Sequence, residues 1–365
     1  MIGGDGQNLI EFTGRWGHQE FDLATGEVGS FRQVSVSGVE HVNGHENGET
    51  LRGNDAANRL HGRGGDDRLV GRAGDDSLFG GDGYDRIWGD AGTDLIDGGD
   101  GVDWLEYYAS PAAVTVDLAA GTGLGGDAEG DTILHIENVI GSGFADRISG
   151  DAADNRIEGG AGADTLSGGD GTLDFLAYSR SGSAVTVDLG AGTASGGHAE
   201  GDVISGFEAI AGSSHDDFLY GDDGDNAIGG GDGSDFISGG DGNDFLKGGR
   251  GFGRDLAEDT LMGGDGADRF FGGTRVFDIV LDYSDTEGDV LVFARRPSSR
   301  SEFVATVGHF QDASGAALGD DDVMDVRIGL EGGTTGNFWI LADGAELDHI
   351  FMRSMGGPTF DLLEG

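Results

Sequence analysis

Residues 53–106 divide into six units of nine residues: GNDAANRLH, GRGGDDRLV, GRAGDDSLF, GGDGYDRIW, GDAGTDLID and GGDGVDWLE. Position 1 of every unit is glycine, and position 8 is leucine or isoleucine. Position 6 is asparagine in the first unit and aspartate in the other five: Asn58, Asp67, Asp76, Asp85, Asp94 and Asp103. A single glycine-rich motif is weak evidence for a fold, but six units in one phase define an internal repeat.

The nine-residue period predicts an all-β fold, a parallel β-roll. Glycines let the first six residues form a turn with positive φ and a close approach of the backbone. The last three residues form a short strand with one aliphatic side chain pointing inward. We expect two units to complete one turn of the roll, so that units two apart stack on the same side. One column then holds Asp67, Asp85 and Asp103, and the opposite column holds Asn58, Asp76 and Asp94.

Stacked carboxylates of this kind need a cation. Neighbouring strands lie about 4.8 Å apart. Two carboxylates at that spacing repel by roughly 1 kcal/mol in water and by about 3–4 kcal/mol at an effective dielectric constant near 20. A hard divalent cation with oxygen ligands reverses the sign of this interaction, and Ca²⁺ is such a cation. The residues at position 6 are therefore predicted to be calcium ligands.

The nine-residue unit recurs in two later arrays, at residues 141–176 and 212–271, with an insertion of about six residues in the third array. Position 6 of these units, or its equivalent where residues are inserted (one before Asp174, about six before Asp259), adds ten candidate ligands: Asp146, Asn155, Asp164, Asp174, Asp217, Asn226, Asp235, Asp244, Asp259 and Asp268. Each ion is expected between units on one side, as between Asp67 and Asp85, Asp85 and Asp103, Asp76 and Asp94, Asp146 and Asp164, or Asp217 and Asp235. Asp103 is the last aspartate of its array, so Asp103→Ala is expected to cost less than Asp85→Ala.

A longer repeat contains the short one. The segments AVTVDLAAGTG around Asp117 and AVTVDLGAGTA around Asp188 are 71 residues apart, and Glu137 and Glu208 have the same separation. A related segment surrounds Asp22. We predict three modules, each a long connecting segment followed by nonapeptides, at residues 1–106, 107–176 and 177–274, and a C-terminal region at 275–365.

Asparagine takes position 6 in the second unit after each long segment, at Asn58, Asn155 and Asn226. One interpretation is a ligand of weaker charge near the start of each array. The other is that asparagine simply favours this turn. The sequence does not choose between them.

The consensus G-G-x-G-x-D-x-U-x, six times in phase, resembles the repeat of RTX, or haemolysin-type, calcium-binding proteins. The resemblance implies a secreted bacterial protein that folds on binding several Ca²⁺ ions after export by type I secretion machinery. Serralysin-like proteases, RTX lipases, alginate epimerases and RTX adhesins have regions of this kind. An alternative function is therefore the C-terminal part of a secreted metalloprotease, lipase or alginate epimerase whose catalytic domain lies upstream, or an adhesin or polysaccharide-binding module.

Composition agrees with a calcium-loaded extracellular protein. The chain has 365 residues with 76 glycines and 3 prolines, and its formal net charge is −47. Such a charge argues against nucleic acid and anionic membranes as partners. There is no cysteine, so neither a disulfide nor a thiolate metal site is possible. The start, MIGGDGQNLI, lacks the basic and apolar regions of a cleavable signal peptide.

The nonapeptides end near residue 275. Ordinary strands are expected within residues 289–296, 302–310, 322–330, 337–344 and 347–354, forming a β-rich cap on the roll. By resemblance to RTX proteins, the last residues, PTFDLLEG, belong to an uncleaved type I secretion signal. At the other end, residues 3–11 correspond to the final nonapeptide of an array. More repeats or a catalytic domain are therefore expected before Met1.

No catalytic motif is found: HExxH, GxSxG, a cysteine nucleophile, a P-loop and a dinucleotide fingerprint are all missing. The chain itself is therefore predicted not to be an enzyme. Arginines and aromatic residues occupy outward positions: Arg59, Arg63, Arg68, Arg72, Arg86, Phe79, Trp88 and Trp104. The favoured interpretation is that the arginines compensate the charge of the aspartates and that the aromatic side chains shield the short strands. The alternative is that these residues form a groove for an acidic polysaccharide.

Overall fold

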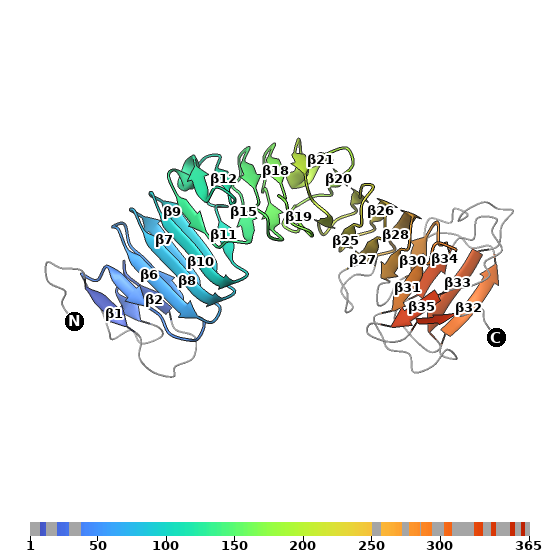
Figure 1. Cartoon of the computed structure of the whole chain (residues 1–365), viewed down its shortest axis with the longest axis horizontal. Helices are drawn as coiled ribbons and strands as arrows, with labels where there is room; N and C mark the ends of the chain where they lie inside the picture. Colours follow the sequence, from blue (N-terminus) through green and yellow to red (C-terminus); the bar gives the residue numbers. More distant parts are fainter. Residues whose placement is uncertain are drawn as a thin grey trace. The chain divides into compact units, whose positions relative to one another are not determined.

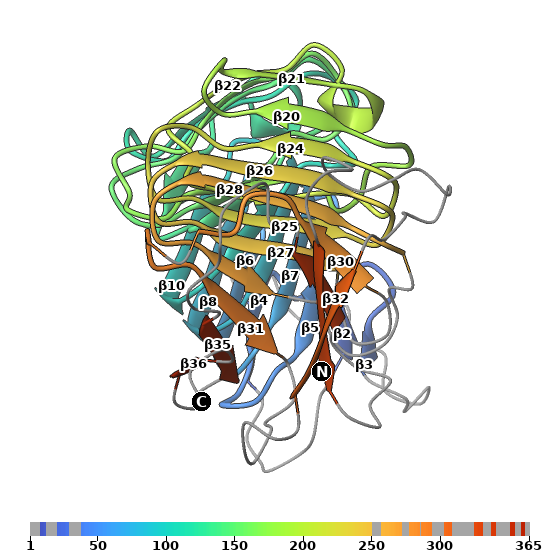
Figure 2. The same ribbon diagram turned by 90° about the vertical axis from the view of Figure 1, so that its right-hand side faces the viewer.

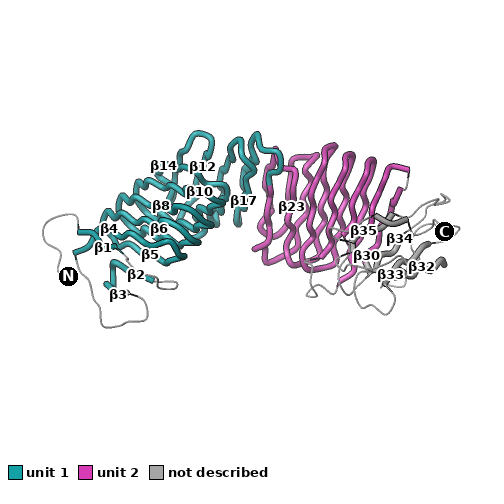
Figure 3. Tube along the Cα trace, turned by 60° about the horizontal axis from the view of Figure 1, so that its bottom comes forward, with its two compact units in different colours: residues 1–174 teal, residues 175–365 magenta. Residues whose placement is uncertain are grey.

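The structure is a computed structural model that describes residues 8–11, 20–28, 38–249, 257–271, 277–284, 286–293, 303–308, 325–330, 337–340, 351–354 and 359–361. It divides into two compact units, residues 1–174 and 175–365, which Figure 3 colours separately. The described residues are nearly all strands and turns, with two short 3₁₀ helices, η1 (Gly126–Ala128) and η2 (Gly197–Ala199). None of the helices in the described ranges is long and apolar enough to cross a membrane. The division of the chain into three repeat modules and a C-terminal region was inferred from sequence repetition and remains a prediction.

The strands of the first unit form two stacks. The first stack contains β1 (Leu9–Glu11), β4 (His41–Asn43), β6 (Arg59–Gly64), β8 (Ser77–Gly83), β10 (Leu95–Gly101), β12 (Thr115–Asp117), β13 (Thr122–Leu124), β14 (Thr132–Leu134), β16 (Arg147–Ser149) and β18 (Thr165–Ser167). The second stack contains β2 (Glu20–Asp22), β3 (Glu27–Val28), β5 (Thr50–Arg52), β7 (Arg68–Ala73), β9 (Arg86–Ala91), β11 (Trp104–Glu106), β15 (Asn138–Ile140) and β17 (Arg156–Glu158). Successive strands of the chain alternate between the stacks wherever nonapeptides run, as Figure 1 shows for β6 to β10.

Each nonapeptide strand pairs in parallel with the strand 18 residues away. Leu60 aligns with Leu78 and Leu78 with Ile96 in the first stack, while Leu69 aligns with Ile87 in the second. All five of these side chains are fully buried, as is Leu105. Two nonapeptides therefore make one turn of a parallel β-roll whose core consists of the aliphatic residues at position 8, as the period predicts.

The long connecting segment between the first two arrays inserts extra strands into the first stack. β14 pairs in parallel with β10, β12 pairs in parallel with β16, and β13 lies antiparallel between β12 and β14. The second stack instead continues directly from β11 to β15. The segment is therefore part of the roll rather than a loop outside it.

The second unit repeats this arrangement. Its first stack contains β20 (Thr186–Asp188), β21 (Thr193–Ser195), β22 (Val203–Ser205), β24 (Phe218–Tyr220), β26 (Phe236–Asp241), β28 (Thr260–Asp265), β30 (Phe277–Val280), β32 (Phe303–Gly308), β33 (Asp325–Leu330) and β34 (Asn337–Ile340). Its second stack contains β19 (Phe175–Ala177), β23 (Ala209–Ala211), β25 (Ala227–Gly231), β27 (Phe245–Gly249), β29 (Arg269–Phe271), β31 (Val290–Phe293), β35 (Phe351–Ser354) and β36 (Thr359–Asp361). Figure 2 shows β24, β26 and β28 lying one above another.

The C-terminal region is β-rich, as predicted. The five expected strand segments contain β31, β32, β33, β34 and β35. β30 and β31 still stack in parallel on β28 and β29, whereas β33 is antiparallel to both β32 and β34. Parallel stacking thus continues beyond the last nonapeptide, where β34 and β35 in turn pair in parallel with β30 and β31. Most of the predicted export signal lies outside the described residues.

Candidate calcium columns in the turns

The position-6 residues lie at the end of each turn, immediately before a strand, and all sixteen are at most 4% exposed. We call those before first-stack strands the first column: Asn58, Asp76, Asp94, Asp146 and Asp164 in the first unit, and Asp217, Asp235 and Asp259 in the second. Those before second-stack strands form the second column: Asp67, Asp85, Asp103, Asn155 and Asp174, and then Asn226, Asp244 and Asp268.

A ladder of hydrogen bonds connects the members of each column. Asp76 Oδ1 accepts the backbone N–H of Asn58 at 2.7 Å, and Asp94 Oδ1 accepts that of Asp76 at 2.8 Å. In the second column, Asp85 Oδ1 accepts from Asp67 and Asp103 Oδ1 from Asp85, both at 2.8 Å. The pairs Asp146–Asp164 and Asp217–Asp235 are joined in the same way. All five pairs of aspartates predicted to be neighbours are therefore neighbours.

The second carboxylate oxygen is different. Oδ2 is buried and has no hydrogen-bond partner among the described residues in seven aspartates: Asp67, Asp76, Asp85, Asp94, Asp103, Asp244 and Asp268. A buried carboxylate oxygen without a donor costs free energy, because the water it loses on folding is not replaced. In these seven aspartates, one carboxylate oxygen holds the backbone and the other is left for a positive group. Asp146 and Asp217 differ, because their Oδ2 atoms accept the backbone N–H groups of Ser142 and Ser213.

The position-1 glycine explains where that oxygen points. A Cβ on Gly71 would collide with Asp76 Oδ2 and would lie 2.7 Å from the carbonyl oxygen of Gly89, in the next turn of the roll. A Cβ on Gly62 would collide with Asp67 Oδ2 and lie 2.6 Å from the carbonyl oxygen of Gly80. Glycine is therefore required where a carboxylate oxygen and the carbonyl oxygen of the following turn converge.

This donor set suits Ca²⁺. The converging atoms are carboxylate and carbonyl oxygens, the ligands that Ca²⁺ prefers. In the described residues, no group of three or more histidines, aspartates, glutamates or cysteines is placed to hold a metal ion. An ion in a column would take backbone carbonyl oxygens beside the carboxylates, at the points where the position-1 glycines leave room.

Burial shifts the pKa of the column aspartates upward. Desolvation is the main cause, and it raises the pKa of Asp67 and Asp94 to about 8 and that of Asp76 and Asp103 to about 7. Neighbouring carboxylates raise these pKa values further, whereas the backbone N–H of the preceding turn lowers them. Asp85 is raised to about 6 by the same burial. Without a cation, these carboxylates favour protons, which is the electrostatic problem anticipated from their stacking.

The asparagines at position 6 act locally in the turn. Asn58 Oδ1 accepts the N–H of Asn54, Asn155 Oδ1 that of Asp151, and Asn226 Oδ1 that of Asp222, each at 2.7 Å. The side-chain amide of Asn155 also donates to the carbonyl of Glu137 at 3.1 Å. An aspartate could not donate this bond. The geometry therefore favours the turn interpretation, and a ligand role for these asparagines remains a prediction.

Two acidic residues of the long segment join the columns and were not predicted to do so. Asp131 Oδ1 accepts the N–H of Asp94 at 2.9 Å, and Glu137 Oε2 accepts that of Asp103 at 2.8 Å. Asp103 is therefore not at the edge of its column, contrary to the expectation from the array boundary. The 71-residue recurrence of Glu137 at Glu208 was the available signal, and Asp131 recurs in the same way at Asp202.

One further carboxylate continues the second column beyond the nonapeptides. Asp289 Oδ1 accepts the N–H of Asp268 at 2.9 Å, and its Oδ2 accepts that of Ser284 at 2.8 Å. Burial raises the pKa of Asp289 to about 7. No nonapeptide surrounds this residue, so the sequence period could not identify it.

The outward arginines compensate acidic side chains outside the columns. Arg72 forms an ion pair with Asp22 at 2.7 Å, and Arg63 pairs with Glu11. Arg59 lies over the ring of Phe79, 4.1 Å from its centroid. Charge compensation and shielding are thus both present, but the paired carboxylates belong to the first strands and not to the columns.

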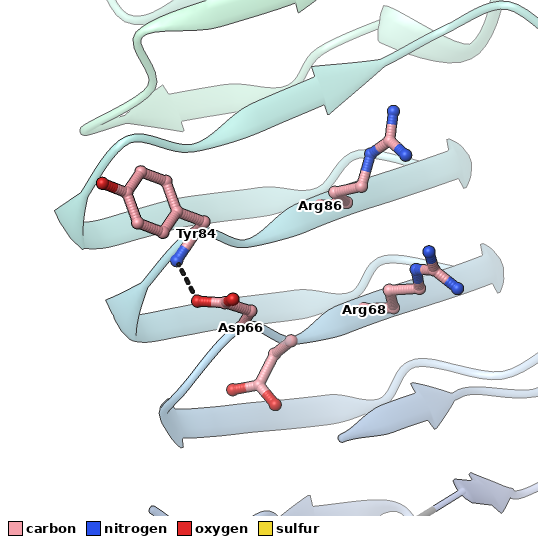
Figure 4. Close-up of a pocket in the computed structure, with 5 residues that line it drawn as sticks. Asp66, Arg68, Tyr84 and Arg86 are labelled. Atoms are coloured by element: carbon pink, nitrogen blue, oxygen red, sulfur yellow. Dashed lines mark hydrogen bonds between the residues drawn. The ribbon is translucent and has the colours of Figure 1, made fainter. Parts of the chain in front are cut away.

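A hollow of about 260 Å³ lies beside the second column, lined by Asp66, Asp67, Arg68, Tyr84 and Arg86. Figure 4 shows the side chains of Arg68 and Arg86 side by side on adjacent strands, where they are register partners. The Tyr84 side chain is 63% exposed, and its backbone N–H donates to Asp66 Oδ1 at 3.1 Å. Arg86 also pairs with the buried Glu106 at 2.6 Å.

Comparison with known proteins agrees with this geometry. The model of the RTX calcium-binding nonapeptide repeat (4 copies) matches residues 43–78, 70–105, 140–172, 204–237, 220–253 and 257–274. No curated protein sequence matches the chain. The solved structures that match include the extracellular lipase LipA from Serratia marcescens, with 16% sequence identity, a TM-score of 0.22, and coverage of 86% of this chain and 42% of the lipase chain. The chain thus spans less than half the length of that lipase. The nonapeptide arrays of this parallel β-roll thus match the RTX calcium-binding nonapeptide repeat.

Proposed function

We propose that this chain is the calcium-dependent β-roll region of a secreted protein, and that calcium binding drives its folding after type I export. The observation that carries the proposal is the set of buried Oδ2 atoms without a hydrogen-bond donor, each beside a position-1 glycine. Bound calcium would supply positive charge between one turn and the next. The residues that would hold it are the column aspartates together with the carbonyl groups of the glycine turns.

Folding and binding are coupled in such an arrangement. The ligands come from separate turns, so no site exists in the unfolded chain, and the binding free energy contributes directly to folding. A ligand that binds only the folded state stabilises it by mass action. Extracellular calcium modules have dissociation constants of about 10⁻⁴–10⁻³ M. The chain would then stay unfolded at cytosolic calcium concentrations and fold outside the cell.

Circular dichroism of the full chain tests this proposal. In calcium-free buffer at about pH 8 the spectrum should be that of an unfolded chain, and millimolar Ca²⁺ should produce a β spectrum that chelator reverses. Mg²⁺ at the same concentration is the control, because its preference for octahedral coordination and retained water does not suit carbonyl-rich turns. A β spectrum that persists in chelator at about pH 8 would refute the proposal.

Export can be tested separately. The proposed uncleaved signal lies in the last residues, so a chain lacking residues 309–365 should remain inside cells that express a type I secretion apparatus, while the full chain reaches the medium. Secretion of both chains to the same extent would exclude a C-terminal signal.

A second candidate function is the binding of an acidic polysaccharide, and the hollow beside the second column favours it. Arg68 and Tyr84 are exposed there, beside Arg86, which pairs with the buried Glu106. They supply local positive charge in a chain whose net charge is −47. Glycan-array binding of the calcium-loaded chain should select uronic-acid polymers and should be lost in Arg68→Ala. Equal binding by both chains, or none by either, would remove this candidate.

A further inference from the structure

Two buried tyrosines occupy equivalent positions in the long segments. Tyr107 donates its hydroxyl hydrogen to Asp131 Oδ2 at 2.8 Å, and Tyr178 donates to Asp202 Oδ2 at 2.9 Å. All four side chains are at most 3% exposed. Both pairs have the 71-residue spacing of the modules, so the same contact is built twice.

These contacts satisfy the oxygen that the column aspartates leave without a donor. In Asp76 and Asp94, Oδ1 accepts a backbone N–H and Oδ2 has no donor in the described part of the chain. In Asp131, Oδ1 likewise accepts the N–H of Asp94, but Oδ2 accepts the tyrosine hydroxyl. The tyrosine thus takes the place of the positive group at this carboxylate.

The turns that precede Asp131 and Asp202 also differ from the turns of the nonapeptides. Gly126 lies five residues before Asp131, as Gly71 lies five before Asp76. A Cβ on Gly126 would meet Ser110 Oγ and the carbonyl oxygen of Ala112, not a carboxylate. Gly197, five residues before Asp202, meets Ser181 Oγ and the carbonyl oxygen of Ser183 in the same way. The convergence of carboxylate and carbonyl oxygens seen at Gly71 is therefore not formed at either position.

We infer that Tyr107 and Tyr178 exclude calcium from Asp131 and Asp202, so that the long segments are metal-free parts of a calcium-loaded roll. A hydroxyl donor replaces the cation where antiparallel strands interrupt the regular turns. The tyrosines are specificity-determining residues: they decide which buried carboxylates of the roll do not take an ion. This inference rests on the proposed calcium-dependent folding.

Calcium stoichiometry of the full chain, measured by equilibrium dialysis at saturating Ca²⁺, tests the inference. D131N/D202N removes both charges but keeps a group that can pair with the tyrosine hydroxyl, so this chain should bind as many ions as the unmodified one. The matched control is D76N/D244N, the same change at two column aspartates, which should bind fewer ions. Loss of ions from D131N/D202N comparable to that of the control would overturn the inference.

The tyrosines give an independent test that does not depend on the aspartate variants. Y107F/Y178F leaves two buried oxygens without donors, so its folding midpoint should shift to higher calcium concentration. An unshifted midpoint for Y107F/Y178F would overturn the inference. An unmodified chain that binds no calcium would instead refute the proposed function itself.

Discussion

At the scale of single residues, the position-1 glycines determine whether a turn can bring its oxygens together. Most glycines of a repeat provide conformational freedom, but these ones provide space, because a carboxylate oxygen lies where a Cβ would be. Glycine is therefore needed at position 1 because it has no Cβ, and not because the backbone has a positive φ there.

Gly71→Ala tests this requirement. The added methyl would collide with Asp76 Oδ2 and press against the carbonyl oxygen of Gly89. We expect the free energy of unfolding of the calcium-loaded chain to fall by about 1–3 kcal/mol, as at other overpacked sites. Gly143→Ala is the matched control, because no atom lies within 4 Å of its Cβ position. Denaturation in saturating calcium measures both, and equal losses would contradict the role given to Gly71.

The pH dependence of the calcium-free chain follows from the raised pKa values. Asp67 and Asp94 have folded pKa values of about 8, against roughly 3.9 in an unfolded chain. The folded state therefore binds protons that the unfolded state has lost, and stability falls as the pH rises from about 4 to about 8.

Calcium-free chain should thus retain more β structure at pH 5 than at pH 8 by circular dichroism. Calcium competes with these protons, so its apparent affinity should rise over the same interval, with proton release on binding. More β structure at pH 8 than at pH 5 in calcium-free buffer would contradict the burial of these carboxylates.

Position within a column sets the cost of losing an aspartate. Asp85 and Asp103 each accept one backbone N–H and donate their own N–H to the next acidic residue. Asp85→Ala and Asp103→Ala should therefore shift the calcium midpoint by similar amounts. Calcium titration by circular dichroism measures both midpoints. A clearly smaller shift for Asp103→Ala would mean that Glu137 does not continue the column.

At the scale of strands, the register depends on an even number of nonapeptides. Strands pair 18 residues apart, and successive units alternate between the two stacks. Deleting residues 71–88 removes one full turn and restores the same pairing, so this chain should still fold on calcium. Deleting residues 71–79 removes one unit and moves every later strand to the opposite stack. That chain should need more calcium and be cleaved faster by protease, and equal behaviour of the two deletions would contradict the register.

The nine-residue period was sufficient to predict the parallel roll, the 18-residue register and the position-8 core. It could not place Asp131 or Glu137, because the pairings that bring them to the columns span 37 and 34 residues and have no fixed period. It also missed β12, β13 and β14 as strands of the roll, since antiparallel strands there break the alternation. The 71-residue recurrence indicated that the segment mattered without indicating its contacts.

At the scale of the whole chain, charge is the main obstacle to folding. A net charge of −47 opposes compaction everywhere, and the columns place the most deeply buried carboxylates one above another. In the nonapeptide arrays, each strand contributes only one aliphatic side chain, at position 8, to the core. Under the proposed function, bound cations would provide the stability that a larger core would otherwise provide.

The location of the ions tests this account most directly. In crystals of the calcium-loaded chain, anomalous scattering should show ions beside position-1 glycines such as Gly62 and Gly71, about 2.3–2.6 Å from an aspartate Oδ2 and a carbonyl oxygen of the next turn. No ion should lie at Asp131 or Asp202. Ions found only at surface carboxylates, with the column Oδ2 atoms bound to water or to protein donors, would contradict it.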